Sequence, residues 1–488
     1  MQTLKNKRGT PVFILWNPVF FRRSQPVFRE HHGYLFVCWH KAAGSRQKNR
    51  ENGVDEMRGI KVWGGQKLHG TVQIPGAKNS VLPIMAAAML CDGRVTLENV
   101  PHLSDVECSA RILQRLGCRV MAAEHFLVIE PTANFQSDIP EDLMHAMRSS
   151  IFFMAPLLAR TGRADMTMPG GCKLGARPID IHLDGLAKMG AMIAQSGEQL
   201  HLTAPHGLKG ADIALRFPSV GATETLLMAA VCAHGQTTLH GCSMEPEVTD
   251  LARFLQKCGA CIEGIGTRCL TVFGAEHLTG TSYRICPDRI TAATVLFAVA
   301  GCGGEAVVKN AREKDLYAVL RMLRGAGCEI HCKEDEIAIA RHHVLYGAGN
   351  FITDVHPAFP TDAAPLAAAA FLRAQGTTTI TDTIFENRFS CAAGFEKMRG
   401  ACGVQGRTIC VQGVARLAGS AVHAPDLRGG AALVLAAAQA EGESMITGIE
   451  HIARGYEDLA GLLIQLGVHA GYVQMQDTAA LLSVAAYA

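Results

Sequence analysis

The sequence predicts an α/β protein of two domains, each built from three copies of a unit of about 70 residues. Three observations predict this fold class. A pattern in which a helix ends at a glycine and a strand follows recurs six times along the chain. A second glycine recurs between these positions, after an alanine-rich helix. The alanine-rich helices are apolar on every side, as is typical of helices buried inside a domain.

The helix-ending pattern is illustrated by Leu113-Gln-Arg-Leu-Gly117-Cys-Arg-Val, in which the glycine stops the helix and turns the chain into the next strand. The same position is occupied by Gly117, Gly190, Gly259, Gly327, Arg399 in a degraded copy, and Gly467. Successive positions are 73, 69, 68, 72 and 68 residues apart. Such a fixed period indicates a repeat architecture.

The second pattern places a β-rich stretch after each alanine-rich helix. Its glycines are Gly93, Gly162, Gly235, Gly304, Gly376 and Gly442. Gly376, for example, is followed by Thr-Thr-Thr-Ile, a run with high strand propensity. Each unit therefore contains two helices and several strands. Because the helices over 81–90 and 431–438 are apolar all round, we expect parallel buried helices under a shell of sheets.

The overall composition excludes several function classes. The 488 residues are 48% hydrophobic and 18% charged, which fits a globular protein with sizeable cores. A net charge of +2 gives no basic field for nucleic acid, and no apolar run is long enough to span a bilayer. The 17 cysteines are irregularly scattered, which favours a reducing compartment. The pair Cys258 and Cys261 is interpreted as packing rather than as a redox or zinc site.

Residues 1–56 differ from the rest of the chain. They carry 10 Lys and Arg against 4 Asp and Glu, and two of the three tryptophans. A signal peptide is one interpretation of the apolar stretch that follows Lys5, Lys7 and Arg8. Asn17 and two prolines interrupt that stretch, so we favour a leader that is disordered or non-native, with Met57 as the effective start.

Cations stand where four of the buried helices are expected to begin: Lys78, Arg148, Arg289 and Arg428. A cation at a helix N-terminus opposes the helix dipole. That cost is tolerated if an anion is shared between the cation and the free N–H groups of the first turn. Several such helix starts that converge on one cleft predict a site for a polyanionic ligand.

The densest local signal is the loop over 169–182, which is rich in glycine and contains Cys172. A lone cysteine most often packs in the hydrophobic core and has no reactive role. Cys172, however, lies between Gly171 and Lys173 with Arg177 five residues on, and nearby cations favour the thiolate. We therefore interpret Cys172 as a reactive thiol.

Ten ordered motifs resemble those of the UDP-N-acetylglucosamine enolpyruvyl transferases, from about residue 57 to about residue 467. They are Gly76-Ala-Lys-Asn79, Pro169-Gly-Gly-Cys172, Gly175-Ala-Arg-Pro178, Ser219-Val-Gly-Ala-Thr223, Glu245-Pro-Glu247, Pro287-Asp-Arg-Ile290, His356-Pro-Ala-Phe-Pro-Thr-Asp362, Phe385-Glu-Asn-Arg-Phe389, Asp426-Leu-Arg428 and Arg454-Gly-Tyr456. The resemblance implies two inside-out α/β barrels of three repeats each. One domain would comprise 57–77 with 287–488, and the other 78–286 with the Cys172 loop.

The resemblance also implies an activity. Enzymes of this family transfer the enolpyruvyl group of phosphoenolpyruvate to the 3′-hydroxyl of UDP-N-acetylglucosamine and release phosphate. This is the first committed step of bacterial peptidoglycan synthesis, which serves cell-wall biogenesis, cell shape and cell division. The resemblance implies a cytoplasmic enzyme that needs no cofactor or metal and binds neither nucleic acid nor membrane. Fosfomycin is the expected covalent inhibitor, at Cys172.

Residue roles carry over from the matching motifs. The resemblance implies catalytic roles for Cys172 as an acid or covalent group, Asp362 as a base, and Lys78. It implies phosphoenolpyruvate contacts from Lys78, Asn79, Arg177 and Arg454. It implies UDP-N-acetylglucosamine contacts from Arg148, Pro178, Ile179, Asp180, Ile181, Ser219, Val220, Gly221, Asp362, Ile384 and Arg388. Arg148 and Arg428 are expected to help the domains close.

Some positions depart from the family pattern, which leaves alternatives open. Phe217 stands where some members have lysine, Thr291 where glutamate is expected, and Ser390 where a histidine can occur. The nearest alternative is the shikimate-pathway enolpyruvyl transferase, which shares the fold and the donor. Another is a catalytically silent paralogue that senses UDP-N-acetylglucosamine. The retained Cys172 and Asp362 favour the active enzyme.

Overall fold

The computed structural model describes residues 58–170 and 178–474, together with the backbone of four short strands near the N-terminus. The chain divides into two units, 1–56 and 57–488. In the first unit β1 (Gln2–Lys5) pairs antiparallel with β2 (Pro11–Ile14), and β3 (Val27–His31) pairs antiparallel with β4 (Tyr34–Cys38). Most of 1–56 lies outside the described residues, so the expected leader stays a prediction.

Apolar helices fill the interior of the second unit. They are α1 (Lys78–Ala87), α4 (Met154–Thr161), α6 (Val220–Val231), α8 (Arg289–Cys302), α10 (Ala364–Ala370) and α12 (Leu427–Gln439). The two stretches predicted to be buried, 81–90 and 431–438, are buried at every position. A helix without a polar face is stable only inside a protein, so these helices define where the cores lie.

Amphipathic helices accompany the apolar ones. They are α2 (Ser104–Arg115), α5 (Asp180–Lys188), α7 (Pro246–Lys257), α9 (Glu313–Gly325), α11 (Ala392–Lys397) and α14 (Leu459–Gln465). Shorter helical segments are α3 (Glu141–Ala146), α13 (Ile449–Ile452), η1 (Ala88–Leu90), η2 (Arg148–Phe153), η3 (Thr361–Ala363) and η4 (Phe371–Arg373). None of the helices in the described part of the chain has the length and apolar character needed to cross a membrane.

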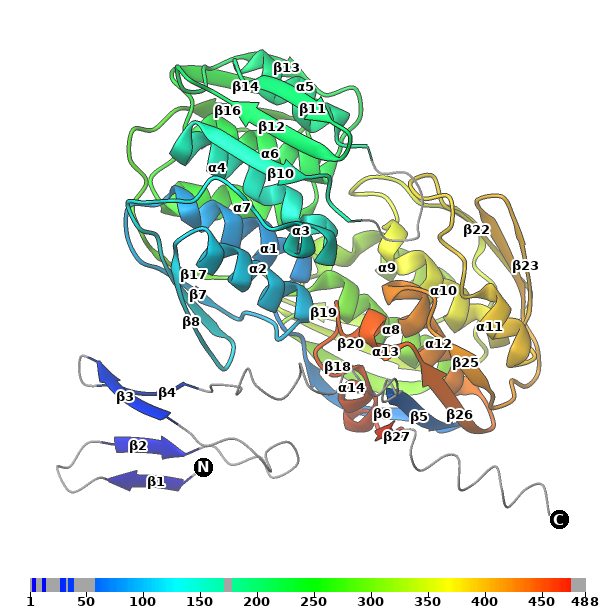
Figure 1. Ribbon diagram of the computed structural model, residues 1–488. Helices are drawn as coiled ribbons and strands as arrows, with labels where there is room; N and C mark the ends of the chain where they lie inside the picture. The colour runs from blue at the N-terminus through cyan, green and yellow to red at the C-terminus, as the bar shows by residue number, and fades with distance from the viewer. Residues whose placement is uncertain are drawn as a thin grey trace. The chain divides into compact units, whose positions relative to one another are not determined.

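Small sheets lie around these helices (Figure 1). In spatial order they are β17 (Ser282–Arg284), β7 (Val95–Glu98), β9 (Phe126–Glu130), β8 (Arg119–Ala123); β10 (Arg163–Thr167), β12 (Gln199–Thr203), β11 (Met192–Ser196); β13 (Asp212–Ala214), β14 (Gln236–His240), β16 (Cys269–Phe273), β15 (Cys261–Glu263); β6 (Leu68–Gln73), β18 (Gly304–Lys309), β20 (Glu336–Arg341), β19 (Glu329–Lys333); β21 (Gly349–Ile352), β22 (Thr377–Thr381), β24 (Thr408–Gln412), β23 (Ala401–Gln405); and β25 (Ala421–His423), β26 (Gly442–Thr447), β5 (Arg58–Gly64), β27 (His469–Gln474).

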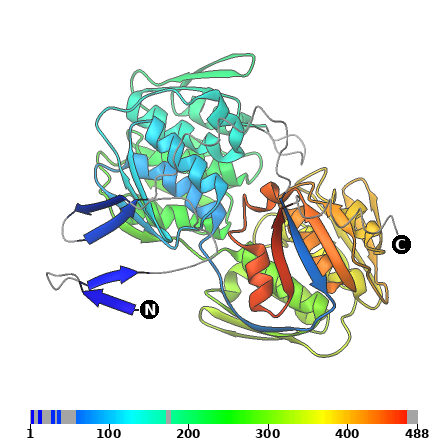
Figure 2. The same cartoon turned by 60° about the horizontal axis from the view of Figure 1, so that its bottom comes forward.

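These sheets repeat one pairing scheme. In each four-stranded sheet an edge strand pairs parallel with its neighbour, and the remaining pairs are antiparallel. The three-stranded sheet keeps a trace of the parallel edge in the isolated bridge between Asp138 and Asp165. The last sheet combines distant parts of the chain, because β5 pairs with both β26 and β27 (Figure 2).

The buried side chains form two hydrophobic cores. One core draws on residues 60–74 and 290–468, and the other on residues 81–285. The predicted helix-ending glycines adopt left-handed conformations, with φ between 89° and 107° at Gly117, Gly190, Gly259, Gly327 and Gly467. The prediction of a repeated helix–glycine–strand unit is therefore confirmed.

Candidate active site

The helix starts predicted at Lys78, Arg289 and Arg428 are confirmed to within one residue, whereas Arg148 begins the 3-10 helix η2, six residues before α4. At the starts of α8 and α12 the free N–H groups already have partners. Asp288 Oδ1 accepts from the N–H groups of Ile290 (2.8 Å) and Thr291 (3.0 Å) at the start of α8. Asp426 Oδ1 does the same for Arg428 (3.0 Å) and Gly429 (2.9 Å) at the start of α12. Because carboxylates of the chain cap these helices, the side-chain cations, rather than the N–H groups, are available to an anionic ligand.

One buried carboxylate joins two of the predicted phosphate-binding cations. Asp105, on α2, lies 2.8 Å from Lys78 Nζ. It also accepts from Arg454 Nε (3.0 Å) and Nη2 (3.3 Å). This three-residue group is called the Asp105 cluster below; Asp105 and Lys78 are largely buried, whereas the Arg454 side chain is 29% exposed. Lys78 and Arg454 come from distant segments, and the structure brings them together at Asp105. Their contact with phosphate stays a prediction.

Burial and the pairing of Lys78 with Asp105 act in opposite directions on the pKa of each of these two residues. Burial lowers the pKa of Lys78, and Arg454 and Arg428 act in the same direction, whereas Asp105 opposes them. Burial works to raise the pKa of Asp105, but Lys78 and Arg454 outweigh it and hold that pKa below its usual value. Asp105 therefore remains a carboxylate at neutral pH and helps to keep the buried Lys78 charged.

A second carboxylate, Asp362 in η3, holds two arginines. Arg428 donates to Asp362 Oδ2 from Nε (3.1 Å) and Nη2 (2.9 Å). Arg388 Nη2 donates to Asp362 Oδ1, and Arg388 Nε donates to the carbonyl of Thr361 at 2.8 Å. This group is called the Asp362 cluster below. Both arginines are nearly inaccessible to solvent, whereas the Asp362 side chain remains 27% exposed and can meet a ligand.

Burial would raise the pKa of Asp362, but Arg428 and Arg388 hold it far below its usual range. Asp362 is therefore ionised, which is the protonation state a base needs. A carboxylate held by two arginines is nevertheless a weak base. For Asp362 to accept a proton, at least one arginine has to shift toward another anion.

Arg428 is placed for such a shift. Its Cζ lies 5.6 Å from the ring centroid of Tyr456, and the Tyr456 hydroxyl lies 2.8 Å from Thr294 Oγ1. Arg428 Nη1 is buried and has no hydrogen-bond partner among the described residues. A buried guanidinium N–H without a partner is a ready donor for an anionic ligand.

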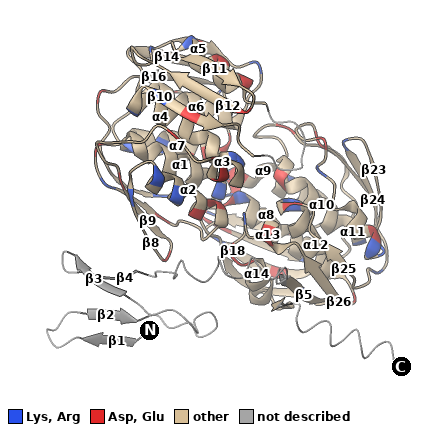
Figure 3. Ribbon diagram, in the orientation of Figure 1, with Lys and Arg blue, Asp and Glu red and all other residues tan. Residues whose placement is uncertain are grey.

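A third group of charges surrounds Arg289, whose carboxylate partners were not anticipated from the sequence. Arg289 Nε lies 2.9 Å from Glu247 Oε1, and both side chains are largely buried. Glu224 on α6 is fully buried, and both of its carboxyl oxygens lack hydrogen-bond partners among the described residues. Burial raises the pKa of Glu224 well above its usual value, and Glu247 and Glu245 raise it further. Figure 3 shows charged residues of both signs on the helices of the second unit.

Some of the residues predicted to bind the nucleotide lie near His182, on α5. Gly221, at the start of α6, lies so close that a Cβ there would sit 3.1 Å from His182 Nε2. Burial, aided by the charge of Arg148, lowers the pKa of His182 to about 4. Arg148 opens η2, which packs against both α1 and α6. The structure thus links Arg148 to the Ser219–Val220–Gly221 turn through a histidine that the sequence argument overlooked.

Two other residues predicted to contact the nucleotide, Asp180 and Ile179, differ in their exposure to solvent. Asp180 is accessible and pairs with Arg216, beside a hollow of about 370 Å³ that is partly lined by Ile181. Ile179 is only 3% exposed, so its side chain packs in the core and cannot contact a ligand. Ile179 is the N-cap residue of α5, with a φ of −106° and a ψ of 12°. A contact from Ile179 can involve only its backbone.

The remaining predicted residues differ in their exposure to solvent. Asn79 is exposed on the first turn of α1, Pro178 is exposed, and Ile384 is half-buried with its N–H donated to Asp382. Cys172 and Arg177 lie outside the described residues, so their roles stay predictions.

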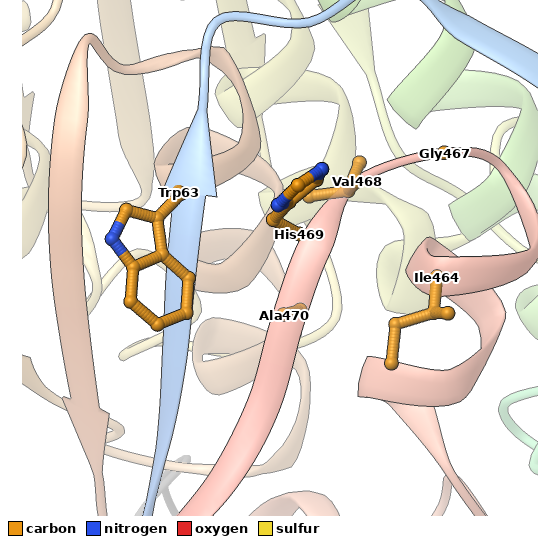
Figure 4. Close-up of a pocket in the computed structure, with 6 residues that line it drawn as sticks. All are labelled: Trp63, Ile464, Gly467, Val468, His469 and Ala470. Atoms are coloured by element: carbon orange, nitrogen blue, oxygen red, sulfur yellow. The ribbon is translucent and has the colours of Figure 1, made fainter.

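A larger hollow of about 420 Å³ lies on the sheet that contains β5 and β27 (Figure 4). It is lined by Trp63, Ile464, Gly467, Val468, His469 and Ala470. None of these residues belongs to the charged clusters, and the lining is largely apolar. We assign no role in the site to this hollow.

Comparison with known sequences gives a consistent picture. A family model described as EPSP synthase (3-phosphoshikimate 1-carboxyvinyltransferase) matches residues 62–463. The chain is 42% identical over 408 residues to a UDP-N-acetylglucosamine 1-carboxyvinyltransferase of Saccharophagus degradans, covering 83% of this chain and 97% of the relative. It is 40% identical over 414 residues to UDP-N-acetylglucosamine 1-carboxyvinyltransferase 1 of Staphylococcus aureus, covering 84% and 98%.

Solved structures share the fold. The enolpyruvyl transferase NikO from Streptomyces tendae superposes with a TM-score of 0.77 at 24% identity, covering 86% of this chain and all of that one. An EPSP synthase from Acinetobacter baumannii superposes with a TM-score of 0.67 at 20% identity and the same coverage. At these identities the likeness establishes the α/β fold alone.

Proposed function

Because this chain belongs to the UDP-N-acetylglucosamine 1-carboxyvinyltransferase branch of the enolpyruvyl transferase family, we propose that it transfers the enolpyruvyl group of phosphoenolpyruvate to the 3′-hydroxyl of UDP-N-acetylglucosamine. Phosphate is the second product, and the reaction opens peptidoglycan synthesis. The observation that carries the proposal is identity of about 40% across nearly the full length of these relatives. A cytoplasmic location of the enzyme is part of the same proposal.

The cation clusters match the charge of phosphoenolpyruvate. Lys78, Arg454 and Arg177 hold its phosphate, with Asn79 beside them, and Arg428 is the further cation that turns toward the bound anion. Phosphate and carboxylate are the groups that guanidinium binds through paired hydrogen bonds. Support comes from Asp105, which already gathers Lys78 and Arg454 around one anionic group.

Asp362 accepts the proton of the sugar 3′-hydroxyl as that oxygen attacks C2 of phosphoenolpyruvate. C3 gains a proton in this addition, and Cys172 as a thiol is the proposed acid. In the second step C3 loses a proton, the C2–O bond to phosphate breaks, and the enol ether forms. The cationic site stabilises the departing phosphate. Fosfomycin, which alkylates thiols, would act at Cys172.

The nucleotide sugar contacts Arg148, Arg388 and Ile384, together with the starts of α5 and α6. Those helix starts contribute Pro178, Ile179, Asp180, Ile181, Ser219, Val220 and Gly221. Residues 57–77 with 287–488 form one inside-out α/β barrel domain and residues 78–286 the other, and closure of the two excludes water. The two separate hydrophobic cores support this division.

The decisive experiment measures phosphate release by the chain with phosphoenolpyruvate and UDP-N-acetylglucosamine, each present and each omitted. We expect release only when both are present, and its loss after treatment with fosfomycin. Release with shikimate 3-phosphate as the sole acceptor would instead assign the shikimate-pathway reaction. Tight UDP-sugar binding without release with either acceptor would assign a silent sensor.

A further inference from the structure

Three metal-ligating side chains from separate parts of the chain meet beside the Asp105 cluster. His102 precedes α2, His125 lies in the turn between β8 and β9, and Glu457 lies between α13 and α14. One potential ligand atom from each residue lies within 4.8 Å of the other two. The imidazole rings are tilted, with centroids 4.9 Å apart. Because the residues come from separate elements, no spacing in the sequence indicated this group.

Hydrogen bonds orient two of these side chains. His125 Nδ1 lies 3.2 Å from the carbonyl of Val100. A carbonyl can only accept, so Nδ1 carries the hydrogen and the lone pair of the neutral ring is on Nε2. Metal-binding histidines are commonly held in this way through their other nitrogen. Glu457 Oε1 accepts from the His102 N–H, which leaves the second carboxylate oxygen available.

The backbone at His125 adopts a φ of 55°, in the left-handed region that residues other than glycine seldom occupy. Its N–H points to His102 Nε2 at a distance of 3.4 Å. Its Nδ1, which also bonds to the Val100 carbonyl, lies 3.6 Å from Glu457 Oε1, so the ring has to turn for Nε2 to face an ion. The turn thus holds an uncommon backbone conformation in which His125 meets both of the other groups.

We propose that His102, His125 and Glu457 bind a divalent transition-metal ion of the zinc class. Two imidazoles and one carboxylate form a ligand set that suits such ions and leaves a fourth position open for water. Bonds of about 2.0–2.2 Å place tetrahedral ligands about 3.4 Å apart, so ligand atoms that now lie within 4.8 Å of one another have to approach by up to about 1.4 Å. His102 is exposed and can make that adjustment by rotation.

The ion would tie together two segments of the active site. His102 precedes Asp105 by three residues, and Glu457 follows Arg454 by three. The N–H of Ser104 already bonds to the carbonyl of Ala453 at 3.5 Å. A bound ion therefore holds Arg454 against Asp105, where it is withheld from the phosphate of phosphoenolpyruvate. This inhibitory consequence depends on the proposed function, whereas the binding itself does not.

The binding test titrates Co²⁺ into the full chain, freed of metal, and follows the visible absorption of the ion. We expect d–d bands without a thiolate-to-metal charge-transfer band, because none of the three ligands is a cysteine. His102→Ala and Glu457→Gln remove one ligand each, and the glutamine retains an acceptor for the His102 N–H. His331→Ala, at an exposed histidine on β19, is the matched control.

Loss of an outer-shell partner weakens metal binding about 10–100-fold, and loss of a ligand should cost at least as much. We therefore expect both variants to bind Co²⁺ at least tenfold more weakly, with His331→Ala unchanged. Unchanged affinity in Glu457→Gln and His102→Ala, or a spectrum dominated by thiolate, would overturn the site. Circular dichroism of each variant checks that the fold is retained.

The functional test adds Zn²⁺ to the phosphate-release assay. We expect Zn²⁺ to raise the KM for phosphoenolpyruvate in the unmodified chain and to have a much weaker effect in Glu457→Gln. Equal inhibition of both proteins would overturn the inhibitory consequence. If the metal-free chain shows no turnover at all, the proposed function fails, and the Co²⁺ titration still decides the metal site.

Discussion

At the scale of single residues, Asp105 has the most consequences for the site. It pairs with both Lys78 and Arg454, so the three residues carry one net positive charge, and it keeps both side chains in one place. Such pairing lowers the reorganisation that the cations undergo when phosphate arrives. The same carboxylate repels an incoming anion, so phosphate has to compete with Asp105 for Arg454.

Arg454→Ala tests the proposed phosphate contact. A charged hydrogen bond contributes about 1.5–3 kcal/mol, so we expect the KM for phosphoenolpyruvate to rise at least tenfold. The Kd for UDP-N-acetylglucosamine should change less than about twofold, since the nucleotide residues lie on other elements. Steady-state kinetics and calorimetry measure the two constants. Arg416→Ala, at a surface arginine that is 76% exposed, is the control. Equal weakening of both ligands would remove Arg454 from the phosphate site.

Cys172→Asp tests the reactive thiol. An aspartate retains a group that can donate a proton but cannot be alkylated by fosfomycin in the same manner. We expect measurable phosphate release that is insensitive to the drug. Mass spectrometry should find the fosfomycin adduct on the unmodified chain and not on the variant. A variant as sensitive as the parent would place the reactive thiol at another of the 17 cysteines.

Glu224→Gln tests the buried carboxyl on α6. The pKa of Glu224 is raised in the folded chain, so the folded state holds a proton that the unfolded state loses above its own pKa of about 4.3. The free energy of unfolding therefore falls as pH rises from about 4.3 toward the higher pKa that Glu224 has in the folded chain. The variant lacks this titration, and its stability relative to the parent should grow by up to about 1.4 kcal/mol for each pH unit.

Urea unfolding at several pH values measures that difference. Glu276→Gln, at an exposed glutamate, is the matched control and should show no such trend. A constant difference between Glu224→Gln and the parent from about pH 5 to about pH 8 would mean that Glu224 is ionised in the folded chain. The result bears only on stability, because Glu224 is not assigned to the proposed reaction.

At the scale of elements, the end of each amphipathic helix is set by one backbone conformation. Gly467 has a φ of 89°, and a Cβ there would meet no atom within 4 Å. Arg399 occupies the equivalent position after α11 and has a φ of 64°. The degraded repeat thus keeps the left-handed turn without the glycine that normally relieves it, so Arg399 is a strained position.

Arg399→Gly and Gly467→Ala form a reciprocal test. A left-handed conformation costs a residue with a side chain about 1–2 kcal/mol, and the freer unfolded chain of glycine offsets roughly half of this. We expect Arg399→Gly to stabilise the chain by about 0.5–1 kcal/mol and Gly467→Ala to destabilise it by about 1 kcal/mol. Thermal unfolding measures both changes. Destabilisation by Arg399→Gly would show that contacts of the arginine outweigh the backbone strain.

The helices and strands could be predicted well from the sequence, because each repeat contains its own helix start and stop signals. Helix-ending glycines and capping residues are local signals, and they repeat at a fixed period. The apolar helices were identified as buried because they have no polar face. These signals required no knowledge of which segments meet in space.

The charged clusters could be predicted only in part. Lys78 and Arg428 stood out as cations at helix starts. Asp105 and Glu247 lie on the amphipathic helices α2 and α7, where an acidic residue normally indicates a solvated face. Both are instead buried, because those helices turn these residues toward cations from distant segments. A contact between residues far apart in the chain leaves no trace in local spacing.

At the scale of the whole molecule, the second unit combines two hydrophobic cores with charges between them. Arg289, beside one core, pairs with Glu247 on α7, which packs on the other. Arg454 and Asp105 form a similar pair. Buried ion pairs add little to stability but are costly to leave half-formed, so they specify how segments meet. This arrangement suits two bodies that fold separately and adjust to a ligand between them.

The two cores can be tested by removing one buried leucine from each. Leu227, on α6, belongs to the core of 81–285, and Leu435, on α12, belongs to the other. Both are fully buried, so each substitution by alanine should cost about 2–5 kcal/mol. If the cores are separate domains, unfolding shows two transitions, and each variant lowers only one of them.

Differential scanning calorimetry measures these transitions, and adding both ligands should bring them closer together, because a ligand held by both domains stabilises both. Ile464→Ala, at a side chain that is 51% exposed, serves as the surface control. A single transition that Leu227→Ala and Leu435→Ala lower equally would mean that the two cores unfold as one cooperative unit. The proposed domain boundaries would then describe the packing of the chain but not its folding, and closure would involve smaller movements than those of independent domains.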